Sequence, residues 1–148
     1  MKPNGARYLE TNHIIIALAA EGVRRDMEMG RLVPRNRKNT GIPHHQMWEQ
    51  LAILVGDTSY CIKNGTYSPD EIAIRIHHRL VFIHPFANGN GRHARFMANV
   101  LAKLQHRPEF TWGAADIVTE GEIRRGYIDA LSAADKNDID LLHTFARS

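Results

Sequence analysis

Apolar residues recur at every third or fourth position along most of the chain, which is the pattern of amphipathic helices rather than of strands. After Ser68, for example, Ile72, Ile76, Leu80 and Ile83 follow one another at spacings of four and three. The predicted helices cover about residues 12–30, 46–63, 69–83 and 90–106, with a fifth opened by Thr119 and Glu122 and a short last one opened by Asp138. The predicted fold class is therefore all-α.

The third of these helices has the clearest ends. Ser68 can cap it, Pro69 suits the first helical position, and Glu71 stands where a capping box needs a carboxylate. The helix cannot continue past Pro85, which lacks an amide hydrogen and disfavours helical geometry at His84. A loop that begins at His84 must therefore join the third helix to the fourth.

A second irregular stretch lies at residues 33–45, where Pro, Asn and Gly interrupt the helical pattern. Thr40, Gly41, Ile42 and Pro43 lie at its centre, and we expect a loop or a short hairpin there. We divide the chain at this stretch into an N-terminal helical segment, residues 1–34, and a core domain, residues 35–148.

Composition narrows the class of protein. The chain has 148 residues, 43% of them hydrophobic, which suits one compact domain. Its net charge of +3 favours anionic partners such as nucleotides but is too small to indicate nucleic-acid binding. Cys61 is the only cysteine, which excludes an internal disulfide, and the longest apolar run, residues 14–20, is too short for a membrane span. We expect a soluble, cytoplasmic protein without a membrane partner.

The loop before the fourth helix carries the residues that suit phosphate binding. Gly89 and Gly91, with Asn90 between them, can adopt positive φ and bring backbone amides close to a ligand. They lie where the fourth helix begins, so unsatisfied N–H groups and the positive end of the helix dipole point outward. This arrangement predicts an anion-binding turn.

Three charged or titratable side chains flank this turn. Arg92 and Arg95 are three residues apart in the first turns of the predicted helix, so two guanidinium groups could clamp phosphate oxygens. His84 could act as a general base on an attacking hydroxyl. Each of these residues alone is more often structural, but the base, the glycine turn and the two arginines lie within twelve residues. Their combination favours a nucleotide site.

The segment His84 to Arg95 resembles the signature of Fic-domain proteins, HPFx(D/E)GNGRxxR, and matches it at every position except one. The resemblance extends over about residues 39–148 and is strongest with the small bacterial branch called mobile mystery protein B. It implies a compact Fic-type helical bundle with a small β-hairpin flap. Most members of this family are nucleotidyltransferases that move AMP from ATP to a Ser, Thr or Tyr hydroxyl of a target protein.

The resemblance also implies a role for each matched residue. His84 would be the general base, and Gly89, Asn90 and Gly91 would bind the α- and β-phosphates. Arg92 would contact the β-phosphate and Arg95 the γ-phosphate. The flap would consist of the residues around Thr40, Gly41 and Ile42, and it would position the target hydroxyl by main-chain pairing.

The departure from the signature is Asn88, which stands where the family has the Asp or Glu that binds Mg²⁺. Mg²⁺ prefers charged oxygen ligands, so the neutral amide of Asn88 would be a weak ligand beside phosphates and water. Three outcomes stay open: slower AMP transfer, a different nucleotide or leaving group, and no catalysis. The alternatives to AMP transfer are therefore transfer of UMP, phosphate or phosphocholine, or a weakly catalytic nucleotide-binding module of a toxin–antitoxin-like system.

The N-terminal segment contains one further candidate. Residues 17–22 partly resemble the family's inhibitory motif (S/T)xxxE(G/N), with Ala17 in place of the Ser or Thr. In that motif the Glu pairs with the second arginine, so Glu21 would pair with Arg95 here. The alternative interpretation of Glu21 is a solvent-exposed charge on a helix. The sequence leaves the target protein and the oligomeric state open.

Overall fold

The computed structural model describes residues 41–148, apart from 87–88 and 116–117. Most of this part of the chain is helix and none of it is strand, which confirms the predicted all-α class. Its elements are the 3₁₀ turn η1 (His44–Gln46) and the helices α2 (Met47–Asn64), α3 (Pro69–Ile83), α4 (Asn90–Leu104), α5 (Glu120–Ala134) and α6 (Asp140–Arg147). The helix expected at residues 12–30 lies outside the described residues.

The expected β-hairpin flap is not supported. Gly41 and Ile42 form a bend, and the described residues contain no strand; Thr40 lies outside them. Gly41 has a φ of 90°, outside the range of a strand, and Pro43 has no amide hydrogen for a strand ladder. The 3₁₀ turn and α2 then follow at once, so the described part of the predicted flap leaves no room for a pair of strands.

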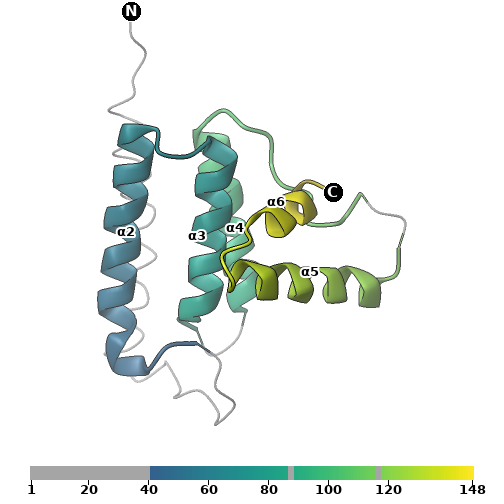
Figure 1. The fold of residues 1–148 in the computed structure, drawn as a ribbon, viewed down its shortest axis with the longest axis horizontal. Helices are drawn as coiled ribbons and strands as arrows, with labels where there is room; N and C mark the ends of the chain where they lie inside the picture. The colour runs from purple at the N-terminus through teal and green to yellow at the C-terminus, as the bar shows by residue number, and fades with distance from the viewer. Residues whose placement is uncertain (1–40, 87–88, 116–117) are drawn as a thin grey trace, which may run out of the picture.

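Helix α3 runs antiparallel to both α2 and α4, and α5 lies crosswise beside α3 and α4, on the side away from α2, with α6 packed against it (Figure 1). The turn between α3 and α4 therefore lies at the same end of the molecule as the start of α2 (Figure 1). This topology brings the bend at Gly41 and Ile42 to the end of the bundle that carries the motif. The side chain of Ile42 packs against the core.

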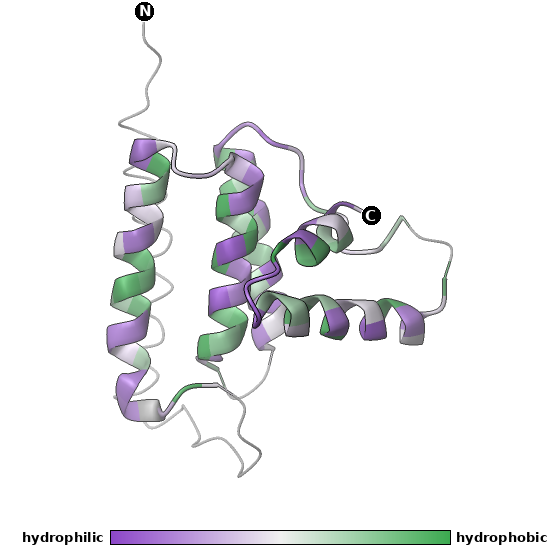
Figure 2. Cartoon of the chain, in the orientation of Figure 1, coloured by the Kyte–Doolittle hydropathy of each residue, from purple (hydrophilic) through white to green (hydrophobic). Residues whose placement is uncertain are grey.

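The core is built from one apolar face of each helix, and every helix also carries hydrophilic residues (Figure 2). Ala73, Ala94 and Ala98 are completely buried and allow α3 and α4 to approach closely. The largest fully buried side chains are Met47, Ile74, Ile83, Leu101, Leu142 and His77. Among the described residues, no helix combines the length and the apolar character that a membrane span requires.

Side-chain caps form where the sequence predicts them. Ser68 Oγ accepts a hydrogen bond from the Glu71 backbone N–H (3.2 Å), with Pro69 in the first position of α3. Thr119 and Glu122 form a complete capping box at the start of α5. These contacts satisfy backbone donors that a helix start leaves unpaired, so local sequence defines both starts.

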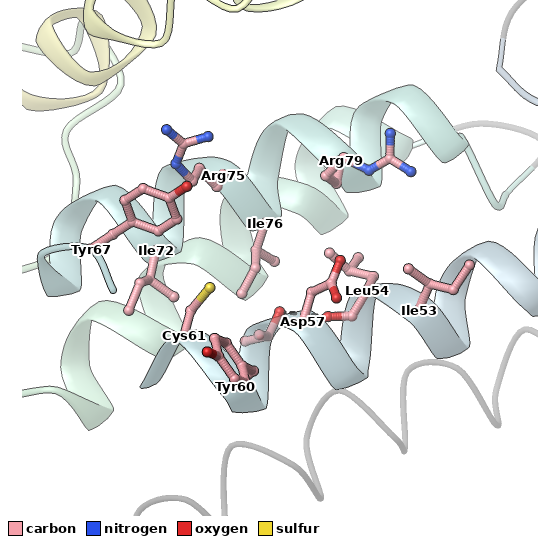
Figure 3. Close-up of a pocket in the computed structure, with 11 residues that line it drawn as sticks. Ile53, Leu54, Asp57, Tyr60, Cys61, Tyr67, Ile72, Arg75, Ile76 and Arg79 are labelled. Atoms are coloured by element: carbon pink, nitrogen blue, oxygen red, sulfur yellow. Dashed lines mark hydrogen bonds between the residues drawn. The ribbon is translucent and has the colours of Figure 1, made fainter. Parts of the chain in front are cut away.

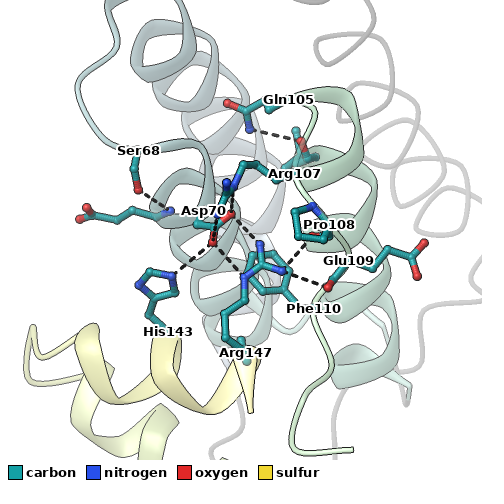
Figure 4. Close-up of polar contacts among 12 residues, drawn as sticks. Ser68, Asp70, Gln105, Arg107, Pro108, Glu109, Phe110, His143 and Arg147 are labelled. Atoms are coloured by element: carbon teal, nitrogen blue, oxygen red, sulfur yellow. Dashed lines mark hydrogen bonds and ion pairs between the residues drawn. The ribbon is translucent and has the colours of Figure 1, made fainter. Parts of the chain in front are cut away.

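Asp70 joins the start of α3 to two distant parts of the chain (Figure 4). Its carboxylate accepts hydrogen bonds from Arg147 (2.6 and 2.9 Å) in α6 and from Arg107 (3.0 and 3.4 Å) after α4. His143 lies 3.5 Å from the same carboxylate. Burial by itself would raise the pKa of the Asp70 carboxyl, but the hydrogen bonds and charges of Arg147 and Arg107 outweigh burial and hold that pKa well below its usual range.

A groove of about 280 Å³ runs between α2 and α3 and contains no residue of the motif (Figure 3). Ile53 and Tyr60 of α2 are 45% and 64% exposed at its edge, and Arg75 and Arg79 of α3 line its other side. The groove is therefore separate from the turn that the sequence analysis singles out.

We expect Asp70→Asn to lower the free energy of unfolding at pH 7 by about 3 kcal/mol, because it removes the buried partner of two guanidinium groups. The folded-state pKa of Asp70 is depressed, so its contribution is present above the unfolded pKa of about 4 and is lost as the pH falls below that value. Urea unfolding at pH 7 and at pH 3 measures the difference in free energy of unfolding between the unmodified protein and Asp70→Asn. This difference should be smaller at pH 3.

Asp129→Asn is the matched control, since Asp129 is exposed on α5. It should change stability by no more than a few tenths of a kcal/mol at either pH. Equal effects of the two substitutions at pH 7 would contradict the role given to Asp70.

Candidate functional site

The motif segment forms the connection between α3 and α4. Within the described residues it comprises His84, Pro85 and Phe86 after α3, and Gly89 before α4. Asn88 lies outside the described residues, as do Glu21 and Thr40. The structure therefore brings together the predicted base, the glycine turn and both arginines, while the metal ligand and the inhibitory contact stay predictions.

His84 ends α3 in an unusual backbone conformation. It is left-handed, with φ 55° and ψ 60°, and its backbone N–H donates to the Leu80 carbonyl at 2.9 Å. A non-glycine residue in this region carries a strain of about 1–3 kcal/mol that the surrounding structure must maintain. Pro85, which is buried, follows directly and fixes the direction of the chain. The His84 side chain is half-buried at the mouth of the turn.

The side chain of Asn90 holds the turn closed. Its Oδ1 accepts from the Phe86 backbone N–H (2.8 Å), and its Nδ2 donates to the Phe86 carbonyl (2.7 Å). Asn90 is 4% exposed, so both hydrogen bonds are shielded from water. Phe86 packs against the core, with its ring 4.9 Å from that of His93, centre to centre. The Asn90 amide is thus committed to the turn, and only its backbone N–H can serve a ligand.

The start of α4 differs from the starts of α3 and α5. Its N-cap is Gly89, with φ 76°, and no side chain within the described residues caps it. The first helical hydrogen bond runs from His93 N–H to the Gly89 carbonyl, so the amides of Asn90, Gly91 and Arg92 have no acceptor within the helix. This end can receive an anion through its free amides and its dipole.

The two arginines extend the positive charge in different directions. The Arg92 side chain is exposed and folds over the turn, with Nη2 3.3 Å from the point where a side chain on Gly89 would begin. Arg95, half-buried, instead lies with its Cζ 5.4 Å from the centre of the Tyr127 ring on α5. Arg92 therefore covers the glycine turn, and Arg95 covers the side of the site that faces α5.

Next to Arg95 is a cavity of about 500 Å³. Its walls are mainly apolar and aromatic, and its charged lining residues are Arg95, Glu120 and Arg124; the other lining residues are Trp112, Ile123, Tyr127, Ile128 and Phe145. A concave apolar space beside a cluster of positive charge is typical of a small-ligand site.

A buried contact behind Arg95 was not predicted as part of the site. His77 is completely buried in α3, and its Nε2 lies 2.9 Å from the Tyr127 hydroxyl. The Trp112 ring lies 4.5 Å from the His77 ring, centre to centre. Burial, together with the nearby charges of Arg95 and His78, lowers the pKa of His77 to about 3, so its ring is neutral at physiological pH.

The sequence contains little signal for this contact. In the sequence, the only feature of His77 is its spacing of seven residues from His84. The only feature of Tyr127 is its place in the apolar pattern of the helix that becomes α5. Burial raises the pKa of the Tyr127 hydroxyl to about 12, although the Arg95 charge acts in the opposite direction. Tyr127 is therefore protonated near neutral pH and sits between a neutral histidine and a charged arginine.

The described residues contain no group of three His, Cys, Asp or Glu side chains that could hold a metal ion. Within the motif, the side chain that could reach a metal is the neutral amide of Asn88, which lies outside those residues. The described residues are thus a poor donor set for Mg²⁺, which would depend mainly on phosphate and water oxygens.

Comparison of this chain with known proteins gives the same family as the motif. A model of the Fic/DOC family matches residues 6–102, more than half of the chain. A protein adenylyltransferase Fic of Aedes aegypti is 33% identical over 49% of this chain and 13% of its own length. That of Nematostella vectensis is 34% identical over 48% of this chain and 15% of its own length. The protein adenylyltransferase fic-1 of Caenorhabditis briggsae is 30% identical over 69% of this chain and 18% of its own length.

The chain spans less than a fifth of the length of these relatives, so the similarity covers a domain and not their whole architecture. The family match includes the connection between α3 and α4 and most of α4. The helical fold, the glycine turn with its arginines and the family match therefore lead to one conclusion: this chain belongs to the Fic/DOC family.

Proposed function

We propose that this protein transfers AMP from ATP to a Ser, Thr or Tyr hydroxyl of a target protein. The observation that carries the proposal is the start of α4, where free amides and the guanidinium group of Arg92 surround the glycine turn. Relatives named protein adenylyltransferases support ATP as the donor. The apolar cavity beside Arg95 supports the same proposal, because a nucleotide joins an aromatic base to its charged phosphates.

Each step can be assigned to the chain's own groups. The target hydroxyl oxygen forms a bond to the α-phosphorus of ATP, and His84 takes the hydroxyl proton. The bond between the α-phosphorus and its bridging oxygen breaks, and pyrophosphate leaves with that electron pair. The amides of the α4 start, Arg92 and Arg95 stabilise the negative charge that develops on the phosphate oxygens. When bound, Mg²⁺ would add Lewis-acid stabilisation of the same charge.

The test for the base is His84→Asn. Asn lacks a ring that can accept the proton, yet it enters the left-handed region more readily than Ala, so the backbone at position 84 is retained. With α-³²P-ATP, Mg²⁺ or Mn²⁺ and a bacterial lysate, labelling by this variant should fall about 100-fold or more below that of the unmodified protein. Gel autoradiography measures the label.

His106→Asn is the matched control, because His106 is also left-handed (φ 59°) but lies beyond the far end of α4. It should label as the unmodified protein does. Label retained in His84→Asn would refute the role of His84. Binding of ATP without any label, in the unmodified protein as well, would favour another donor group or a weakly catalytic nucleotide-binding module.

Asn88→Asp tests the metal requirement. A carboxylate in place of the neutral amide supplies the charged oxygen that Mg²⁺ prefers, so we expect tighter binding of the ion to the ATP complex, by about tenfold. Titration with Mn²⁺ followed by electron paramagnetic resonance measures this affinity directly, without reference to activity. Asn90→Asp is not a suitable control because it disrupts the turn; Asn99→Asp, in the middle of α4, serves instead. Equal Mn²⁺ affinity of the Asn88 variant and the unmodified protein would exclude position 88 from the metal site.

Inhibition by Glu21 is a further part of the proposal. If Glu21 pairs with Arg95, then Glu21→Gly should free that arginine and raise both ATP affinity and auto-modification by several-fold. Glu28→Gly, in the same predicted helix, controls for the loss of helix propensity. Calorimetric ATP titration and auto-labelling together measure the effect. Identical behaviour of the two variants would mean that Glu21 is an ordinary surface charge.

A further inference from the structure

Side chains from three helices meet on the α5 side of the motif: His77 from α3, Arg95 from α4 and Tyr127 from α5. We infer that Tyr127 is a positioning residue: its hydroxyl, tied to His77, fixes the Arg95 guanidinium beside the first turns of α4. None of the three belongs to the glycine turn itself. The inference deepens the proposed function, on which it rests for the identity of the ligand.

His77 is a rigid anchor for this contact. It is completely buried, and the Trp112 ring packs at 4.5 Å against it, so the imidazole has no space in which to turn. Its Nδ1 is buried without a hydrogen-bond partner among the described residues. The ring nitrogen that is paired is therefore Nε2, which shares one proton with the Tyr127 hydroxyl at 2.9 Å. This hydrogen bond holds the hydroxyl in place.

Tyr127 in turn contacts α4 at two levels. Its hydroxyl oxygen lies 3.6 Å from the point where a side chain on Gly91 would begin, so it rests directly against the first turn. Its ring lies under the Arg95 guanidinium one turn further along, with the Arg95 Cζ 5.4 Å from the ring centre. The same ring also packs against Phe145 of α6, with the ring centres 5.7 Å apart. The tyrosine therefore cannot move away from α4 without disturbing two other helices.

The consequence for Arg95 is a loss of conformational freedom before any ligand binds. A free arginine has many rotamers, and a ligand that needs one of them must overcome that entropy. A guanidinium held over an aromatic ring and beside a hydroxyl is already ordered. Arg92, which is exposed and has no such support among the described residues, provides an internal comparison.

The first experiment examines the free protein. In Tyr127→Phe the ring remains but the hydroxyl is lost, so we expect the order parameter of the Arg95 Nε–H group, measured by ¹⁵N relaxation, to fall toward the range of flexible groups. The signal of Arg92 should not change. Tyr60→Phe, at an exposed tyrosine on α2, is the matched control and should leave both signals unchanged. An unchanged Arg95 order parameter in Tyr127→Phe would overturn the inference, whatever the ligand of the site.

Two variants of His77 separate the effect of the hydrogen bond to Tyr127 from a general loss of folding. His77→Gln keeps an N–H donor near the position of Nε2, so it should retain the ordered Arg95, whereas His77→Leu should lose it in the same way as Tyr127→Phe. Circular dichroism identifies any variant that has unfolded. Loss of Arg95 order in both His77 variants, with the fold intact, would mean that the hydrogen bond to Tyr127 is not what holds the arginine.

The second experiment measures nucleotide binding by calorimetry. Because Arg95 is assigned to the terminal phosphate, Tyr127→Phe should weaken ATP binding about fivefold and leave AMP binding unchanged. In an Arg95→Ala background the same substitution should have no further effect on ATP. Equal losses for ATP and AMP would overturn the positioning role. Absence of nucleotide binding by the unmodified protein would refute the proposed function alone, since the relaxation measurement still decides the inference.

Discussion

The two hydrogen bonds between the Asn90 side chain and the backbone of Phe86 are the constraint on which the candidate site depends. They close the turn between α3 and α4 inside a nearly dry environment, where an unpaired amide would be costly. With the turn closed, Gly89 is left at the start of α4 with its neighbouring amides free, and His84 is left at the end of α3. The positions of the proposed base and of the amides proposed to bind an anion therefore follow from one side chain that has no proposed contact with the ligand.

Around that turn, the bundle supplies support from a distance. The Tyr127 contact transmits the packing of α5 and α6 to Arg95, while Asp70 joins the opposite end of α3 to Arg107 and Arg147. In the first contact, the Tyr127 hydroxyl lies against α4 and the Tyr127 ring packs against Phe145. In the second contact, the buried Asp70 carboxylate of α3 is paired with two guanidinium groups. The charged residues of the site are thus attached to a scaffold whose helices cannot easily shift relative to one another.

Local physics explains which features the sequence predicts well. The starts of α3 and α5 are capped by residues within one turn, and the end of α3 follows from Pro85, so these boundaries are confirmed closely. The motif is recognisable in the sequence because its residues are close together in the chain. The Asp70 and Arg147 pair is 77 positions apart, and Tyr127 meets Arg95 only through tertiary packing, so neither contact has a local signature. The expected hairpin is not supported at residues 41–43, the described part of the loop before η1, because a Pro- and Gly-rich composition is equally typical of a simple bend.

Because the turn depends on the side-chain amide of Asn90, chemical damage to that amide would alter the turn. Asn is among the thermally labile residues of proteins, and hydrolysis of the Asn90 side chain would replace its Nδ2 donor with a carboxylate oxygen. That oxygen would face the Phe86 carbonyl, which at present accepts the Nδ2 hydrogen bond, and two acceptors would repel each other. A protein damaged in this way would keep its helices and its core while losing the shape of the turn. During storage, the candidate site would then lose its geometry sooner than the protein loses its fold.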